Sequence, residues 1–160
     1  MKMSVRTVFL TLTLLGLFSF ALGSSGFGGI GTSTKVHASP QSWWDDLELL
    51  SRIIMGEAMG EPFMGQVAVG AVVINRTRSP EFPNTVAGVM YEPDAFESVT
   101  NGLVWSNTPS ETEVRAAELA LNGWDPTGGA LFFWNPSKPV GPWIWTRPII
   151  LQIGDHVFAY

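Results

Sequence analysis

The apolar segment at residues 66–76 limits the possible folds of this chain more than any other feature. Seven of its eleven residues are apolar, namely Val67, Ala68, Val69, Ala71, Val72, Val73 and Ile74. They fall on every side of a helix, so the segment belongs in the interior as a buried helix or a buried strand. Its length and the small residues Gly70 and Ala71 favour a helix that packs closely against its neighbours. We therefore predict a central buried helix.

Other helices are expected on the N-terminal side of this segment and after it. Residues 43–55 place Leu47, Leu50 and Ile54 at helical spacing, and Pro62 should end this helix by the residue before it. A shorter helix is expected near residues 86–90, within a stretch that otherwise reads as loop.

The C-terminal third of the chain combines one helix with extended segments. Residues 110–122 start with a capping-box pattern and are followed by a glycine, which is typical of a complete helix. The apolar run 130–134 and the segment 143–145, which follows a Gly-Pro turn, together predict a β-hairpin. In such a strand Trp143 and Trp145 would point to the same face. Helices followed by a small sheet predict the α+β class.

The N-terminus has the pattern of an export signal. Residues 1–6 carry two basic side chains, and residues 7–22 are uncharged and mostly apolar, a run shorter than the ~20 residues that span a membrane. Small residues favour cleavage after Ala38, with cleavage after Gly23 or an uncleaved anchor as alternatives. We expect a secreted protein with no stable membrane insertion once the signal is removed.

This interpretation divides the chain into three parts. Residues 1–38 form the signal peptide, residues 39–46 a short linker, and residues 47–160 one folded domain. Residues 1–38 hold three of the nine basic residues and none of the fourteen acidic ones, so the remainder has a formal charge of −8. An acidic domain makes nucleic acid a poor partner.

Composition also restricts the available chemistry. The chain has no cysteine and two histidines, which excludes disulfides, thiol nucleophiles and zinc–thiolate sites. We expect no metal and no cofactor. Catalysis would therefore depend on carboxylates.

Glu57 is the first candidate for such a carboxylate. It lies three residues after Ile54, on the apolar side of the predicted helix, and its neighbours Gly56 and Ala58 are small enough to leave space for a ligand. A carboxyl group partly withdrawn from water keeps its proton more readily, as a general acid requires. The alternative is that Glu57 pairs with an arginine inside the fold. Glu61 is a competitor that we expect to be solvated.

The tryptophans supply the candidate binding residues. Five of the seven lie between Trp105 and Trp145, and aromatic rings stack on the apolar faces of sugars while amides bond the hydroxyls. The alternative role for each tryptophan ring is packing in the core. His156 is expected to have a structural role. The proposed sugar-binding residues are Trp105, Trp134, Asn135, Trp143 and Trp145, with Tyr91, Glu92 and Phe96 as weaker candidates.

Several blocks of the sequence, in order, resemble the catalytic domain of bacterial spore cortex-lytic cell wall hydrolases. The likeness extends from about Leu47 to Phe158. The blocks are GEAMGEPF at 56–63, GQVAV at 65–69, VVINR at 72–76, FPNTVAGV at 82–89, YEPDAF at 91–96, ALNGWDP at 120–126, GALFFWNP at 129–136, WIWTRP at 143–148 and QIGDHVF at 152–158.

The resemblance implies a lysozyme-like α+β domain that acts on the glycan strands of peptidoglycan in the cell wall or spore cortex. It implies Glu57 as the catalytic acid and lytic transglycosylase chemistry between N-acetylmuramic acid and N-acetylglucosamine, which leaves a 1,6-anhydromuramic end. One carboxylate, acting first as the acid and then as the base that takes the proton of the muramic C6 hydroxyl, suffices for that reaction without a metal. The tyrosines common in the family's hairpin block are replaced here by Phe132, Phe133 and Trp134.

The sequence leaves three alternatives to this function open. A true hydrolase would need a second acid, such as Glu61 or Glu92, to activate water. A catalytically silent wall-binding module would use the aromatic residues alone. A vegetative wall is possible as the substrate instead of the cortex. An accessory wall protein is a possible partner, and we expect a monomer.

Overall fold

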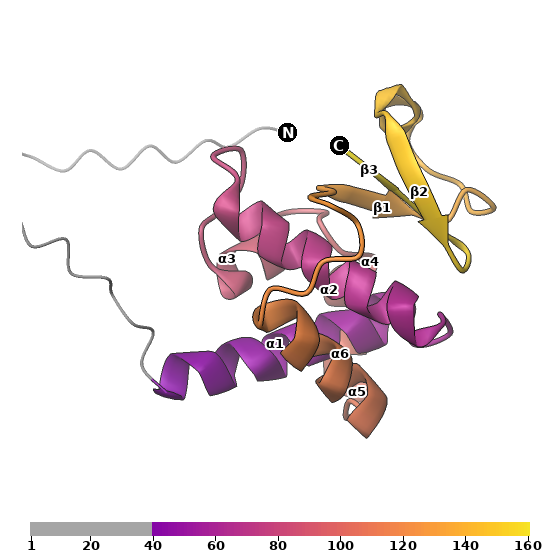
Figure 1. The fold of residues 1–160 in the computed structure, drawn as a ribbon. Helices are drawn as coiled ribbons and strands as arrows, with labels where there is room; N and C mark the ends of the chain where they lie inside the picture. Colours follow the sequence, from indigo (N-terminus) through magenta and orange to yellow (C-terminus); the bar gives the residue numbers. More distant parts are fainter. Residues whose placement is uncertain (1–39) are drawn as a thin grey trace, which may run out of the picture. The chain divides into compact units, whose positions relative to one another are not determined.

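The structure, a computed structural model, describes residues 40–160 (Figure 1). The predicted signal peptide, its cleavage sites and the alternative anchor lie outside the described residues. Within residues 40–160, no helix is long and apolar enough to cross a membrane.

Helix α2 (Phe63–Arg78) is the centre of the fold, and its burial confirms the prediction for residues 66–76. It packs against α1 (Pro40–Ala58) and α6 (Glu111–Leu121). A Cβ added to Gly70 of α2 would lie 3.0 Å from both Ala120 and Ile54, so the glycine permits this close three-helix contact. Burying each large apolar side chain of this core contributes roughly 1.5–3 kcal/mol.

Helix α1 begins earlier than predicted. Residues 40–46, which the sequence suggested as a linker, form its first turns because Pro40 suits the first helical position, where no backbone donor is needed. Trp43 packs against the core from this turn, and Gln41 Nε2 donates to Asp45 Oδ1 at 2.9 Å. The apolar face of the helix therefore extends to its N-terminus.

Three short helices and the capped helix α6 complete the helical part. They are α3 (Val86–Met90), which was predicted, α4 (Glu97–Thr100) and α5 (Leu103–Ser106). Both hydrogen bonds of the predicted capping box between Ser110 and Glu113 are present at the start of α6. Gly123, with φ +92°, follows the end of that helix.

The strands form one antiparallel sheet in the order β1-β3-β2. These are β1 (Phe132–Trp134), β2 (Ile149–Ile153) and β3 (His156–Ala159), with Phe133 opposite Phe158 in the register. Figure 1 shows this sheet on one side of α2 and α1 on the other. The α+β class is confirmed.

The predicted hairpin between residues 130–134 and 143–145 is wrong. The second segment is the 3-10 helix η1 (Pro142–Thr146), and β1 pairs with β3 at the C-terminus instead. Pro142 and Pro148 bracket the segment, and neither can donate a ladder hydrogen bond. Trp143 and Trp145 therefore do not share the face of a strand.

Candidate active site

Glu57 lies in the last turn of α1 and is held by the first turn of α4. Its Oε1 accepts two hydrogen bonds from Ser98, one from the backbone N at 3.0 Å and one from Oγ at 2.5 Å. A Cβ on Gly56 would lie 2.5 Å from the Ser98 side chain, so only glycine lets α4 approach this closely. The space beside Gly56, which we expected a ligand to use, is filled by Ser98. No ion pair involves Glu57 among residues 40–160.

The Glu57 carboxylate opens into a cleft of about 460 Å³. The end of α1, helix α4, strand β1, the loop at 135–140 and the start of β3 line this cleft. Its polar lining includes Glu57, Arg76, Ser98, Asn135, Lys138 and His156. The cleft therefore combines the partly buried carboxylate of Glu57 and the exposed carboxylate of Glu97 with two cations and an imidazole.

Arg76 is a site residue that sequence reasoning missed. Its side chain is buried, its Nε donates to Leu131 O at 2.8 Å, and its guanidinium carbon lies 5.1–5.8 Å from the ring centroids of Phe82, Phe96 and Phe132. Burial lowers the pKa of Arg76 to about 10, against the opposing effect of the carboxylates of Glu92 and Glu57. Arg76 therefore remains a cation at neutral pH. A charged residue within an otherwise apolar helix was the available signal.

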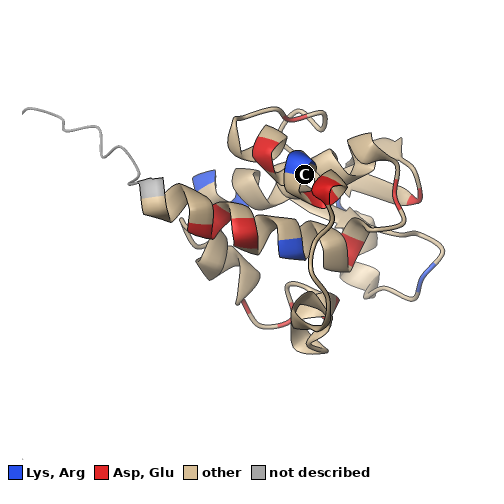
Figure 2. Ribbon diagram, turned by 90° about the horizontal axis from the view of Figure 1, so that it is seen from below, with Lys and Arg blue, Asp and Glu red and all other residues tan. Residues whose placement is uncertain are grey.

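The charges around the cleft contrast with the rest of the domain. Residues 40–160 contain fourteen acidic and six basic side chains, and Figure 2 shows the acidic positions spread along the ribbon with few basic ones among them. Two of the six basic residues, Arg76 and Lys138, line the cleft. The site is thus locally more cationic than its surroundings.

Glu61 and His156 form a buried pair in the same region. Glu61 Oε1 lies 3.4 Å from His156 Nδ1, and each side chain is 9% exposed. Glu61 Oε2 accepts a hydrogen bond from Asp155 N at 2.9 Å. Burial lowers the pKa of His156, and the negative charge of Glu61 opposes this. The expectation that Glu61 is solvated was therefore wrong.

Comparison with known proteins identifies the family. The model of the cell wall hydrolase family matches residues 60–159. The chain belongs to this family. It is 51% identical over 115 residues to the spore cortex-lytic enzyme of Bacillus cereus, covering 72% of this chain and 44% of that protein. It is 30% identical over 120 residues to the cell wall hydrolase CwlJ of Bacillus subtilis, covering 71% of this chain and 83% of that one.

Two solved structures share the fold of this cell wall hydrolase domain. One is the catalytic domain of the germination-specific lytic transglycosylase SleB from Bacillus anthracis, with a TM-score of 0.69 and 49% identity over 72% of this chain and 94% of that one. The other is the catalytic domain of the Bacillus cereus SleB protein, with a TM-score of 0.69 and 47% identity. The match covers 83% of this chain and 100% of that one. They support the predicted lysozyme-like α+β class. The chain spans half or less of the length of the spore cortex-lytic enzymes that it matches.

The cell wall hydrolase cleft contains only some of the predicted binding residues. Trp134 and Asn135 line it together with Glu57. The Trp134 ring is 5% exposed and packs edge-on against Trp145, with ring centroids 5.6 Å apart. Trp143 and Trp145 are about half exposed on η1, which follows the lining loop, but they are not part of the lining.

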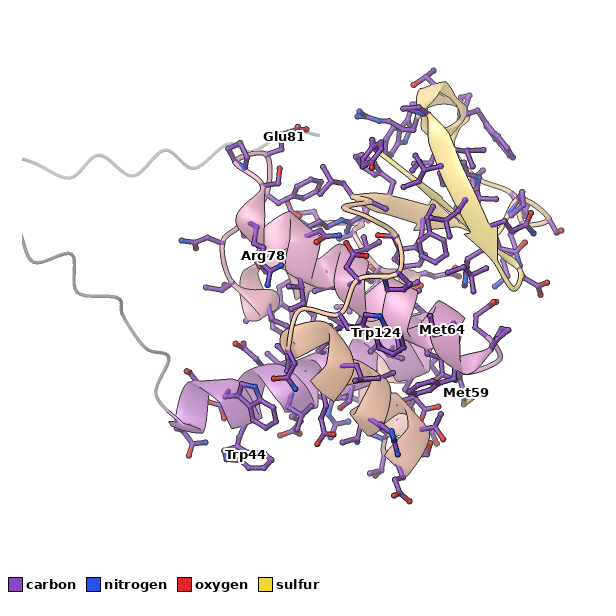
Figure 3. All side chains as sticks on the ribbon, in the orientation of Figure 1. Trp44, Met59, Met64, Arg78, Glu81 and Trp124 are labelled. Atoms are coloured by element: carbon purple, nitrogen blue, oxygen red, sulfur yellow. The ribbon has the colours of Figure 1, made fainter. Side chains whose placement is uncertain are left out.

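The remaining candidates lie elsewhere. Phe96 is 3% exposed, belongs to the core and does not line the cleft. Tyr91 is exposed and Glu92 half-buried, and neither lines the cleft. Trp105 is exposed with the Arg52 guanidinium 5.0 Å from its ring centroid, also away from the lining. Figure 3 shows a further exposed ring, Trp44, projecting from α1 far from the sheet.

Proposed function

We propose that this chain cleaves the glycan strand of peptidoglycan between N-acetylmuramic acid and N-acetylglucosamine, as a lytic transglycosylase. The observation that carries the proposal is the Glu57 carboxyl, fixed by two hydrogen bonds in the lining of a cleft that also contains Arg76 and Trp134. The family match begins at residue 60, so the assignment of Glu57 depends on this geometry and on the sequence pattern around it.

The hydrogen bonds decide which oxygen of Glu57 carries the proton. Oε1 accepts from both donors of Ser98, so Oε2 is the oxygen free to hold a proton and point it at a substrate. Oε2 would protonate the glycosidic oxygen as the bond to C1 of the muramic acid breaks. The two Ser98 donors and the nearby cation Arg76 then stabilise the carboxylate that remains.

The C6 hydroxyl of the same muramic acid completes the reaction. Its oxygen bonds to C1 and its proton passes to a base in the site, which forms the 1,6-anhydro ring without consuming water. Protonation of the glycosidic oxygen needs only one fixed carboxylate, and Glu57 supplies it. Of the carboxylates proposed as water activators, Glu61 is bound to Asp155 N and His156, and Glu92 does not line the cleft.

A true hydrolase is the second candidate, because Glu97 also lines the cleft. It lies in the first turn of α4, exposed to solvent, next to the serine that binds Glu57. An exposed carboxylate at this position could activate a water against C1. The two candidates differ in whether Glu97 is required.

The biological setting belongs to the same proposal. The names of the relatives point to spore cortex and germination, and the export pattern at residues 1–38 is compatible with action outside the cytoplasmic membrane. We propose that the protein is secreted to the cell wall or cortex and acts there as a monomer, with Trp134 and Asn135 contacting sugar. An accessory wall protein remains a prediction.

Two matched variants test the proposed chemistry. Glu57→Gln keeps the size of the side chain and removes the titrating proton, so release of muropeptides from purified sacculi should fall by roughly 10²–10⁴-fold. Glu97→Gln should retain activity within a few-fold. Loss of activity in Glu97→Gln would favour the hydrolase. Sacculus binding by the wild type without any release of product would favour a wall-binding module.

A further inference from the structure

A second acid–base pair, which the proposed reaction has not used, lies at the edge of the cleft. Glu61 and His156 face each other across 3.4 Å, from Oε1 to Nδ1, and both side chains are 9% exposed. His156 also lines the cleft into which Glu57 opens. Glu61 comes from the connection after α1, and His156 is the first residue of β3. Residues far apart in sequence therefore meet beside the proposed catalytic acid.

The turn between β2 and β3 is built around this pair. Gly154 has φ +59°, and a Cβ there would lie 2.0 Å from Glu61 Oε2 and 2.7 Å from Pro62 Cδ. The next residue, Asp155, donates its backbone N–H to the same Oε2 at 2.9 Å. The carboxylate thus has a fixed place under the turn.

The imidazole is fixed as well. The ring of Phe133 packs edge-on against it, with centroids 5.4 Å apart and planes at 83°. His156 Nδ1 is buried and makes no hydrogen bond within the described part of the chain. Glu61 Oε1, 3.4 Å away, is close enough for a charge interaction with it. Catalytic hydrogen bonds are often long or poorly aligned without substrate and tighten only when it binds. Because Nδ1 lies on the side of the Glu61 carboxylate, a small rotation of the ring would direct Nδ1–H at it and leave Nε2 to accept a proton from the cleft.

We propose that His156, oriented by Glu61, is the base that removes the proton from the C6 hydroxyl of the muramic acid. This inference rests on the proposed lytic transglycosylase function and divides its two proton transfers between two groups. Glu57 Oε2 gives its proton to the glycosidic oxygen as the C1–O bond breaks. O6 bonds to C1, and its proton passes to His156 Nε2. The imidazolium then returns the proton to the Glu57 carboxylate through water, which restores both groups.

The charges around His156 suit a base at neutral pH. Burial lowers the pKa of the imidazole, and the cation Lys138 acts in the same direction. Glu61, Glu57 and Asp155 act in the opposite direction. The neutral imidazole is the form that accepts a proton, so activity should fall as the solution becomes acidic enough to protonate His156.

Three variants of the full chain test this role. His156→Gln should lower muropeptide release at neutral pH by roughly 10²–10⁴-fold and abolish the decline at acidic pH. Glu61→Gln should lower release by roughly 10–100-fold. It should also move the acidic decline to lower pH, because removing the Glu61 charge lowers the pKa of His156. Glu81→Gln is the matched control on an exposed loop beside α2 (Figure 3) and should behave as wild type.

A measurement on the wild type keeps the test decisive if a variant fails to fold. The chain has two histidines, so the imidazole signals of His37 and His156 can be followed separately by NMR across pH. The midpoint of the His156 titration should coincide with the acidic decline in activity. A mismatch of more than about one pH unit would overturn the proposal. So would a folded His156→Gln variant with near wild-type activity or an unchanged acidic decline.

These outcomes are distinct from failure of the proposed function. If the wild type releases no muropeptides, or releases products with hydrolysed ends, the lytic transglycosylase proposal fails. If it releases anhydro products and Glu57→Gln does not, while His156→Gln remains active, only the role of His156 fails.

Discussion

Replacing Gly56 by alanine tests the geometry that holds Glu57. The added Cβ would lie 2.5 Å from both Cβ and Oγ of Ser98 and 3.2 Å from Val104 Cγ1. Carbon atoms in good contact are 3.5–4.0 Å apart, so Ser98 must move by roughly 1 Å. The Ser98 N to Glu57 Oε1 distance of 3.0 Å would then exceed hydrogen-bonding range. Overpacking of this kind costs about 1–3 kcal/mol.

The predicted consequences are separable in two assays. The midpoint of thermal unfolding should fall by about 3–12 °C for a domain of this size. Muropeptide release should fall by up to about 10²-fold even at temperatures where the variant is folded, because misplacing a catalytic group by 1 Å has that effect. Circular dichroism gives the first quantity, and chromatography of digested sacculi gives the second.

Gly60→Ala is the matched control for this prediction. A Cβ on Gly60 meets nothing within 4 Å, and its backbone is not in the left-handed region. This variant should have unchanged activity and a stability within about 1 kcal/mol of wild type. If Gly56→Ala matches Gly60→Ala in both assays, the argument that Gly56 admits Ser98 to Glu57 is refuted.

Two further predictions concern stability. Gly154→Ala combines φ +59° with displacement of Glu61, so it should lower the free energy of unfolding by about 1–3 kcal/mol from the backbone alone, measured by urea denaturation. Asp125 accepts hydrogen bonds from Thr127 and from Gly129 and Asn75, which hold its pKa below the usual range against the effect of burial. It therefore contributes stability above about pH 4 that is lost as pH falls through the lowered pKa. Asp125→Asn should lose about 1–2 kcal/mol at neutral pH, with the deficit shrinking in acid; a pH-independent deficit would contradict this.

The helical core could be predicted from sequence because its signals are local. The apolar residues of 66–76 cover every side of a helix, and the Ser110–Glu113 box depends on residues three apart. Glu57 was singled out for the same reason, from its helical spacing to Ile54 and its small neighbours in sequence. The helical start at Pro40, three residues before the predicted one, was missed because residues 40–42 carry no apolar pattern of helical spacing.

The sheet and most of the cleft depend on contacts between distant residues. β1 pairs with β3, which lies more than twenty residues away, and nothing local distinguishes that partner from the nearer segment at 143–145. Ser98 reaches Glu57 across 41 positions and His156 meets Glu61 across 95. Arg76 is explained only when three phenylalanine rings gather around it. The tryptophans divide similarly, with Trp134 in the cleft and Trp105 outside it.

The oxygen source of the new sugar end tests the central claim most directly. Purified sacculi would be digested by the wild type in water labelled with heavy oxygen, and the released muropeptides analysed by mass spectrometry. The account predicts products with ends lighter by one water and without label, and no such products from Glu57→Gln. Labelled reducing ends from the wild type would show that water attacks C1 and would contradict the lytic transglycosylase mechanism.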